Sequence, residues 1–571
     1  MKYLKFDSRY DKQPYISIDH YRAISGYENI ARELNRALKG KRIIALECYP
    51  GVDLREIEEQ LIDRLDVGER IDIEDYALPA EEIDRLIGRN LTDDRVFGLM
   101  SHFRAEEFYD RKKLDALKEK LSGVQSAVVY GFGASLIACD LLVYLDMTRW
   151  EIQLRYRKGM PNWRCSNYDE DILRKYKRGF FVEWRTADRL KKDVLKKADY
   201  YLDTNVRNDP KMIEGTALFA GLKTISNRPF RLVPYFDPGV WGGQWMKEVC
   251  NLDPSQKNYA WSFDGVPEEN SLLLDFSGIR VEVPAIDLVF FEPHALLGER
   301  VHARFGTEFP IRFDFLDTME GGNLSLQVHP LTEYIQDTFG MHYTQDESYY
   351  ILDAKEDACV YLGVKEGISP SEMIADLKAA QRGEKSFDDR KYINCFPAHK
   401  HDHFLIPAGT VHCSGRNAMV LEISATPYIF TFKLWDWNRV GLDGKPRPVH
   451  IEHGEKVIQF DRDTAWVKEN LINRFEKAED GSVRTGLHER EFIETRRYMF
   501  DRKIRIETTG SVNMNNLVEG RAALIESVHG EFEPFEVHYA ETFIVPASIT
   551  AYTIRPLYEG ETCGVIKAYV R

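Results

Sequence analysis

The sequence lacks several features that would indicate particular classes of protein. Its eight cysteines are scattered and form no C-x-x-C pair, so neither a thiolate zinc site nor a disulfide framework is indicated. It also lacks a basic excess, since 92 acidic residues face 77 basic ones and the net charge is -15. We therefore expect no nucleic-acid partner, because nothing in the overall charge attracts a polyanion.

Long hydrophobic runs are also missing. The most apolar stretch, residues 127–145, contains two glycines and Asp140, and it predicts two short buried segments rather than a membrane-spanning helix. The first residues, MKYLKFDSRYDK, carry no apolar signal region. Together with the unpaired cysteines, this predicts a cytoplasmic protein with reduced thiols and no membrane partner.

The composition is that of a folded chain of several domains. Of its 571 residues, 43% are hydrophobic and 30% are charged, and this length is too great for one hydrophobic core. Short β-rich runs alternate with helical patterns up to about residue 215, which predicts a parallel α/β sheet. Short strands follow, with one helix expected near 370–382, where Ser369, Pro370 and Glu372 form an N-terminal capping pattern. We predict an α/β domain at 1–215, a β domain with this helical insertion at 216–460, and a smaller β domain at 461–571.

Residues 42–58, RIIALECYPGVDLREIE, have the layout of a phosphate-binding loop but not its chemistry. In G-x-x-x-x-G-K-[ST], glycines admit the phosphate, a lysine binds it and a hydroxyl binds Mg²⁺. These four places are taken here by Cys48, Asp53, Leu54 and Arg55. The strand, the loop and the segments IEDYALPAEEID, VVYGFGA, LLVYLD and LRYRKGMPNWR nevertheless resemble the uridine kinase and phosphoribulokinase group over roughly residues 25–205.

This resemblance implies a degenerate, non-phosphorylating P-loop-like domain, because its defining motif has been lost. Three arginines of its lid-like segment, Arg155, Arg157 and Arg164, could bind an anion or could form surface ion pairs. Kinase activity remains a less favoured hypothesis, and it predicts ATP binding.

A second group of residues has the composition of a metal site. Gln327 and His329 are two apart in a predicted strand and so face the same way. Glu347 precedes another strand, and His412 follows the turn PAG. Two imidazoles, a carboxylate and an amide suit a divalent metal in an open, catalytic site. On spacing alone, the favoured interpretation is that these histidines bind no metal, since isolated histidines on strands are usually core or surface residues.

Six segments in order, PYFDPGVWGG, LSLQVHP, E-x-x-Y-I-L, IPAGTVH, LEI and WDWNRVGLDGKPRPVHI, resemble the type I mannose-6-phosphate isomerases, zinc enzymes of the cupin superfamily. The resemblance implies jelly-roll cupin domains and a Zn²⁺ ion, or another divalent metal, bound by Gln327, His329, Glu347 and His412. It further implies a sugar-phosphate substrate and proton transfer between C1 and C2, which needs positive charge near the developing enediolate.

The sequence departs from this family at substrate contacts. Lys433 stands where the family usually has an arginine, and Gln345 stands where it usually has a lysine. We assign the cationic catalytic roles to Lys433 and Arg439, with Lys445 and Arg447 as further candidates, and substrate contacts to Trp241, Ser325 and Gln345. His401 and His403 are interpreted as solvent-exposed loop histidines, with an extra metal contact as the less favoured alternative, and the same two interpretations apply to His450 and His453. The alternative is a catalytically impaired cupin that binds metal and a sugar phosphate as a regulatory protein.

Overall fold

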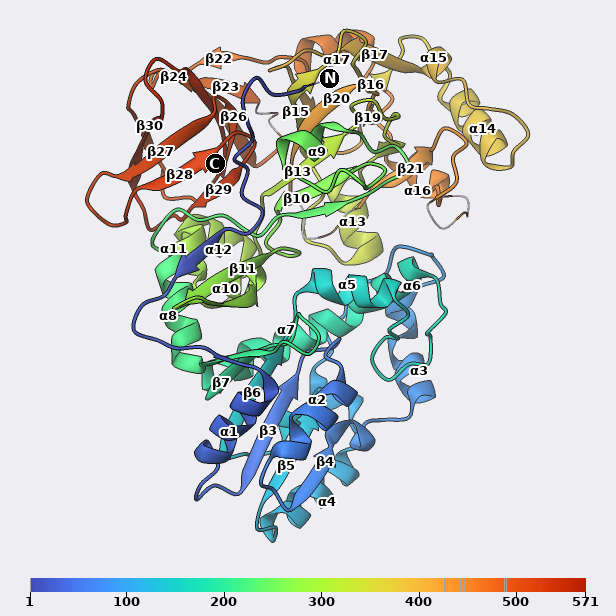
Figure 1. Cartoon of the computed structure of the whole chain (residues 1–571). Coiled ribbons are helices and arrows are strands. Elements are labelled where there is room, and N and C mark those ends of the chain that lie inside the picture. Colours follow the sequence, from blue (N-terminus) through green and yellow to red (C-terminus); the bar gives the residue numbers. More distant parts are fainter. Residues whose placement is uncertain are drawn as a thin grey trace. The chain divides into compact units, whose positions relative to one another are not determined.

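The chain folds into two compact units. The computed structural model describes residues 2–571 except 426–427, 429, 442–443, 445–446, 487 and 489. The α/β unit comprises Tyr15–Ile225 and Ser271–Phe291. The β unit comprises the first 14 residues, Ser226–Asn270 and Glu292–Arg571. Figure 1 shows the elements of both units, coloured along the sequence.

A seven-stranded sheet forms the centre of the α/β unit. Its strand order is β2 (Ile24–Ser25), β8 (Lys211–Glu214), β7 (Tyr200–Asp203), β6 (Leu141–Asp146), β3 (Ile43–Cys48), β5 (Ala127–Gly131) and β4 (Glu69–Asp72). The five strands from β7 to β4 run parallel to their neighbours, whereas β8 and β2 are antiparallel. The predicted parallel sheet is therefore confirmed.

Helices accompany this sheet because each parallel connection needs a crossover. They are α1 (Tyr27–Ala37), α2 (Leu54–Gln60), α3 (Ala80–Leu91), α4 (Arg111–Ser122), α5 (Arg149–Arg157), α6 (Ile172–Arg178), α7 (Trp184–Val194) and α8 (Gly215–Ile225). Ile30 and Leu34 of α1 pack in one core cluster with residues of β3, β5 and β6. The central strand β3 is buried at all but its first position, as expected for a sheet covered on both faces.

A hairpin from the middle of the sequence completes the α/β unit. Strands β11 (Ser271–Phe276) and β12 (Ile279–Pro284) pair with each other, and β11 also pairs with β1 (Tyr15–Ser17). Helix α10 (Ala285–Phe291) follows. In the sequence this segment falls within the predicted domain at 216–460, and it packs with the α/β unit. The domain bounds near 215 and 460 stay predictions. The local pattern of residue types along a sequence carries no information on such long-range packing.

The first part of the β unit contains two antiparallel sheets. One has the order β18 (His403–Ile406), β15 (Glu347–Ala354), β20 (Ala418–Ser424), β13 (Arg312–Asp317), β10 (Trp261–Gly265) and β9 (Tyr235–Asp237). The other has the order β17 (Ile393–Pro397), β16 (Cys359–Val364), β19 (His412–Ser414), β14 (Leu326–Val328) and β21 (Phe432–Trp435). We call them the six-stranded and five-stranded site sheets. The jelly-roll topology stays a prediction.

The C-terminal part of the β unit has two further antiparallel sheets. The larger contains β22 (Glu476–Lys477), β23 (Val483–Gly486), β24 (Ile493–Phe500), β31 (Cys563–Val570), β26 (Asn513–Glu519) and β29 (Thr542–Val545). The smaller contains β25 (Ile504–Glu507), β30 (Ala551–Pro556), β27 (Ala522–Ser527) and β28 (Phe535–His538). Leu517 and Val565 of the larger sheet share a buried cluster with Ile525 and Ile554 of the smaller one. The two C-terminal sheets thus share a buried apolar cluster.

The helices of the β unit are short apart from the predicted insertion. They are α9 (Trp245–Val249), α11 (Pro293–Leu297), α12 (Glu299–Phe305), α13 (Thr332–Phe339), α14 (Pro370–Gln381), α15 (Asp389–Tyr392), α16 (Ile451–Val457) and α17 (Thr464–Asn470). Helix α14 confirms the expectation near 370–382, and the Ser369 hydroxyl accepts a hydrogen bond from the Glu372 backbone N–H at 3.4 Å. The Glu372 carboxylate bonds instead to Lys391 Nζ at 2.6 Å. Across the described part of the chain, no helix combines the length and apolarity that crossing a bilayer requires.

Candidate metal centre

Four side chains from both site sheets meet in the interior of the β unit. Gln327 on β14 and His412 on β19 are directly paired across the five-stranded site sheet. His329 follows β14, two positions after Gln327, and alternation directs it to the same face. Glu347 is the first residue of β15 in the six-stranded site sheet. The two sheets therefore face each other at this point.

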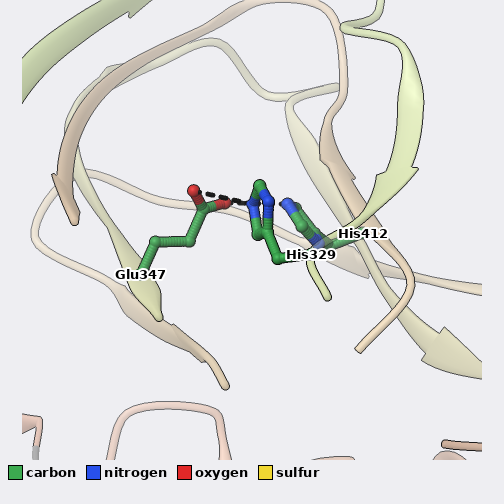
Figure 2. A group of neighbouring side chains, drawn as sticks. All are labelled: His329, Glu347 and His412. Atoms are coloured by element: carbon green, nitrogen blue, oxygen red, sulfur yellow. Dashed lines mark ion pairs between the residues drawn. The ribbon is translucent and has the colours of Figure 1, made fainter. Parts of the chain in front are cut away.

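The donor atoms of these residues converge. His329 Nε2 is 3.0 Å from Glu347 Oε2, and His412 Nε2 is 2.7 Å from Glu347 Oε1. One ligand atom from each of these three residues lies within 4.8 Å of the others (Figure 2). Gln327 Nε2 is 3.2 Å from His412 Nε2, and turning the amide would put its Oε1 at that position. All four residues are buried.

Backbone carbonyls fix the orientation of both imidazoles. The Nδ1–H of His329 donates to the Phe430 carbonyl at 2.9 Å, and that of His412 donates to the Thr410 carbonyl at 2.8 Å. Each Nε2 is thereby left as a lone-pair donor facing Glu347, which is how metal-binding histidines are held. Neither His329 Nε2 nor Glu347 Oε1 makes a hydrogen bond within the described residues. The donor set therefore fits a divalent cation that takes nitrogen and oxygen ligands.

Electrostatics keep Glu347 charged in this buried place. Burial raises the pKa of Glu347, but His329 and His412 outweigh it and hold the pKa well below its usual value. Burial lowers the pKa of His329, and Glu347 reverses this and gives a net rise. The carboxylate is thus in the anionic form that cation binding needs, whereas a bound cation would take the place of the proton that the raised pKa favours on His329.

Further polar side chains surround the Glu347 carboxylate. Gln345 is buried, and its Nε2 donates to Glu347 Oε2 at 3.0 Å. Glu422 is also affected by this carboxylate: burial and then the charge of Glu347 raise the pKa of Glu422 well above its usual value. Gln345, which the sequence assigns to the substrate, thus contacts a candidate metal ligand.

Of the predicted cations, Lys433 lies on β21 of the five-stranded site sheet, and Arg439 and Arg447 follow that strand in the sequence. Lys433 on β21 is paired directly with Gln327, so both side chains project from one face. Arg439 and Arg447 instead converge on buried Asp436, with Nη–Oδ distances of 2.6 Å and 3.2 Å. The Ser325 hydroxyl donates to the same carboxylate at 2.7 Å. We call Ser325, Asp436, Arg439 and Arg447 the Asp436 cluster.

Comparisons with known proteins give one family model and several curated relatives that each match part of the chain. The family model described as a domain of unknown function, DUF8485, matches residues 26–227, about a third of the chain. A mannose-6-phosphate isomerase of Bacillus subtilis (strain 168) is 27% identical over 237 residues, which are 41% of this chain and 69% of that protein. A mannose-6-phosphate isomerase of Streptococcus mutans is 27% identical over 221 residues, or 38% of this chain and 64% of that protein.

Solved structures give weaker likenesses. The crystal structure of the mannose 6-phosphate isomerase from Bacillus subtilis is covered completely by 60% of this chain, with 18% identity and a TM-score of 0.49. A zinc-bound mannose 6-phosphate isomerase is likewise covered completely by 60% of the chain, with 15% identity and a TM-score of 0.47.

Other residues singled out in the sequence lie apart from the donor set. Trp241 is 1% exposed and packs edge-on against Trp261, with ring centroids 4.7 Å apart, so it is part of the core. His401 contacts Tyr350 Oη at 2.7 Å and Glu519 Oε2 at 3.2 Å. His403 is fully buried on β18 rather than in an exposed loop, and this corrects the sequence interpretation. Lys445 lies outside the described residues.

Two acidic residues of this region were missed in the sequence. Asp436 forms ion pairs with two arginines, and Glu422 lies near enough to Glu347 for the charge of that carboxylate to raise its pKa. A signal existed for Asp436, because it stands between two tryptophans in WDWNR, three residues before Arg439. For Glu422, in VLEIS on a strand that is buried throughout, the signal was a charged residue inside an apolar run.

Proposed function

We propose that the chain is a metal-dependent aldose–ketose isomerase that interconverts mannose 6-phosphate and fructose 6-phosphate, or acts on a related sugar phosphate. The observation that carries this proposal is the convergence of His329, Glu347 and His412 within 4.8 Å, with Gln327 beside them. The two mannose-6-phosphate isomerases that align with about two fifths of the chain support the choice of reaction.

The proposed metal is zinc. Gln327, His329, Glu347 and His412 would hold it, and two imidazoles with a carboxylate and no thiolate suit a catalytic rather than a structural zinc site. When bound, such a cation supplies Lewis acidity that polarises a sugar carbonyl or hydroxyl oxygen. All eight cysteines are free thiols, and this supports a proposed location in the reducing cytoplasm.

The chain's own cations would act on the substrate. Lys433, directly opposite Gln327, would stabilise negative charge that develops on the enediol oxygens next to the donor set. In the Asp436 cluster, two guanidinium groups share one carboxylate, so one positive charge remains to attract a phosphate. Arginine suits this task because its planar fork matches phosphate geometry.

A coupled assay tests the proposal directly. The zinc-loaded protein should convert mannose 6-phosphate to fructose 6-phosphate and the reverse, and the chelated protein should not. Metal content is measured on the same samples. Bound metal and saturable sugar-phosphate binding without interconversion would contradict the isomerase proposal and favour the regulatory alternative, for which Gln345 in place of the usual lysine is the supporting observation.

A further inference from the structure

The α/β unit contains a large cavity of its own. Its volume is about 910 Å³, and all its lining residues belong to this unit. The lining comes from the loop between β3 and α2, from Glu74 after β4, from Phe132 after β5, from α5 and from residues 160–168. It therefore lies at the carboxyl ends of parallel strands, the edge at which open α/β sheets bind ligands.

The wall formed by the β3–α2 loop is not suited to a triphosphate. The Asp53 carboxylate caps α2 by accepting a hydrogen bond from the Glu56 N–H at 3.3 Å, so a negative group already occupies the helix start. Arg207 lies 3.4 Å from the same carboxylate. Arg155 Nη1 donates to the Gly51 carbonyl at 3.2 Å. The loop is thus closed by side chains of the protein.

Other walls of the cavity carry surplus positive charge. Arg55, Lys158 and Arg164 line it, and within the described residues none of them forms an ion pair closer than 4 Å. The acids Asp53 and Glu151 are matched by Arg207 and Arg155. The remaining lining acid is Glu74; burial and then Asp72 raise its pKa to about 7, and the charge of Arg164 acts in the opposite direction. A cationic cavity is unusual in a chain of net charge -15.

The segment that carries Arg164 is firmly positioned. Arg164 has a φ of 54°, a left-handed conformation that non-glycine residues rarely adopt and that is often found where ligands are clamped. Nearby Asn162 is buried, and its Nδ2 donates to Tyr156 Oη at 3.0 Å and to the Lys175 carbonyl at 3.1 Å. On the same segment, Tyr168 lines the cavity with 56% of its surface exposed.

We propose that this cavity binds a phosphate monoester that carries a flat ring. Arg164 and Lys158 bind the phosphate, and the exposed ring of Tyr168 stacks on the ligand's ring. Phosphate selects arginine for its bidentate geometry, and stacking on an aromatic side chain tolerates many ring types. A nucleoside monophosphate and a phosphorylated aromatic compound share this chemistry. This site is independent of the metal centre and of the isomerase proposal.

The test uses calorimetric titration of the full-length chain with phenyl phosphate, adenosine 5′-monophosphate and inorganic phosphate. Arg164→Asn removes the charge while keeping a residue that tolerates positive φ, and it should weaken binding of all three probes about tenfold or more. Lys158→Gln should act in the same direction. Tyr168→Ala should weaken the two ring-bearing probes about tenfold and leave inorganic phosphate unchanged. The relative affinities of phenyl phosphate and adenosine 5′-monophosphate distinguish the two sources of ligand.

The matched control is Arg157→Gln. Arg157 is on the same helix as Arg155, but it does not line the cavity and lies over the Trp150 ring, so its loss should leave every affinity unchanged. Chelating divalent metal before the titration should also change nothing, and this separates the cavity from the metal centre. No binding at millimolar probe, equal effects of Arg157→Gln and Arg164→Asn, or Mg²⁺-dependent ATP binding much tighter than that of the monophosphate would each overturn the proposal.

Discussion

Gln327 stands between Lys433 and His412, directly opposed to each of them across neighbouring antiparallel strands. Directly opposed residues project from the same face of a sheet, so an ammonium group, an amide and an imidazole form one row. Glu347 approaches this row from the other site sheet. The arrangement places a cation beside the donor set without making it a ligand.

Replacing Lys433 should therefore separate catalysis from metal binding. We expect Lys433→Met to lower kcat for mannose 6-phosphate by about 10²- to 10³-fold, the range for removing one group that stabilises developing negative charge. Metal content should stay at the wild-type value. Lys433→Arg should recover part of the rate because it keeps the charge. The measurement is a steady-state coupled assay with metal analysis of each variant.

Lys355→Met is the control, since Lys355 forms a surface ion pair with Glu320 at 2.7 Å. It should leave kcat unchanged. Full activity in Lys433→Met would remove this lysine from the catalytic proposal.

Removing one candidate ligand should abolish metal binding. In His412→Ala, the imidazole that lies 2.7 Å from Glu347 is lost, and we expect less than one tenth of the wild-type zinc content. Zinc at a hundred times its Kd should stabilise the wild-type protein by about 2.7 kcal/mol and the variant hardly at all. The measurements are elemental analysis and thermal unfolding with and without zinc. His401→Ala, outside the donor set, should bind zinc normally, and equal zinc loss in both variants would argue against this site.

Gln345 offers a test between two roles. Its Nε2 donates to Glu347 Oε2 at 3.0 Å, so Gln345→Met should weaken zinc binding by about 10- to 100-fold, as for other residues that orient metal ligands. At saturating zinc, KM for the sugar phosphate should stay near the wild-type value. The check is a zinc titration followed by kinetics at saturating metal. A raised KM with unchanged zinc affinity would instead support the substrate contact expected from the sequence.

The local features of the fold were predictable because they depend on neighbouring residues. The alternation of strands and helices up to about residue 215 corresponds to the parallel sheet, and the capping pattern at Ser369 marks the start of α14. Packing between distant segments was not predictable. The hairpin of β11 and β12 joins the α/β unit by pairing with β1, more than 250 residues earlier, and no local pattern encodes such a contact.

The same distinction applies to the candidate site. Residue types, together with the family resemblance of the six ordered segments, pointed to Gln327, His329, Glu347 and His412, which the structure brings together. Neighbours whose roles depend on side-chain direction were harder to assign. The direction in which Gln345 points and the burial of Trp241 follow from tertiary packing, which a single sequence does not contain.

A buried ion triad joins the mid-sequence hairpin segment to the α/β sheet. Lys191 Nζ is 2.8 Å from Asp146 Oδ2 and 2.9 Å from Asp287 Oδ1, and all three side chains are buried. Lys191→Met would leave two facing carboxylates without a cation, and it should cost about 3–5 kcal/mol of unfolding free energy. Adding Asp287→Asn to the Lys191→Met variant should restore part of this loss, because one of the two facing carboxylates is then neutral. Urea unfolding is the measurement, and the exposed Lys112→Met should stay within about 0.5 kcal/mol of wild type.

His403 should make the protein sensitive to acid. Burial lowers its pKa to about 3, and the charge of Arg497 adds to the effect. The folded chain keeps His403 neutral while the unfolded chain protonates it near pH 6.5, so its contribution is complete above that pH. The contribution of His403 to the free energy of unfolding falls as the pH drops from about 6.5 towards 3, by up to about 1.4 kcal/mol per pH unit.

The variant His403→Leu isolates this contribution. Urea-unfolding midpoints measured at pH 7.5, 5.5 and 4.5 should fall less steeply with acid than those of the wild type, even if the variant is less stable at pH 7.5. His399→Leu is the matched control, because His399 is 75% exposed beside Asp402 and its replacement should leave the slope unchanged. Parallel curves for the wild type and His403→Leu would mean that the buried imidazole gains its proton without unfolding.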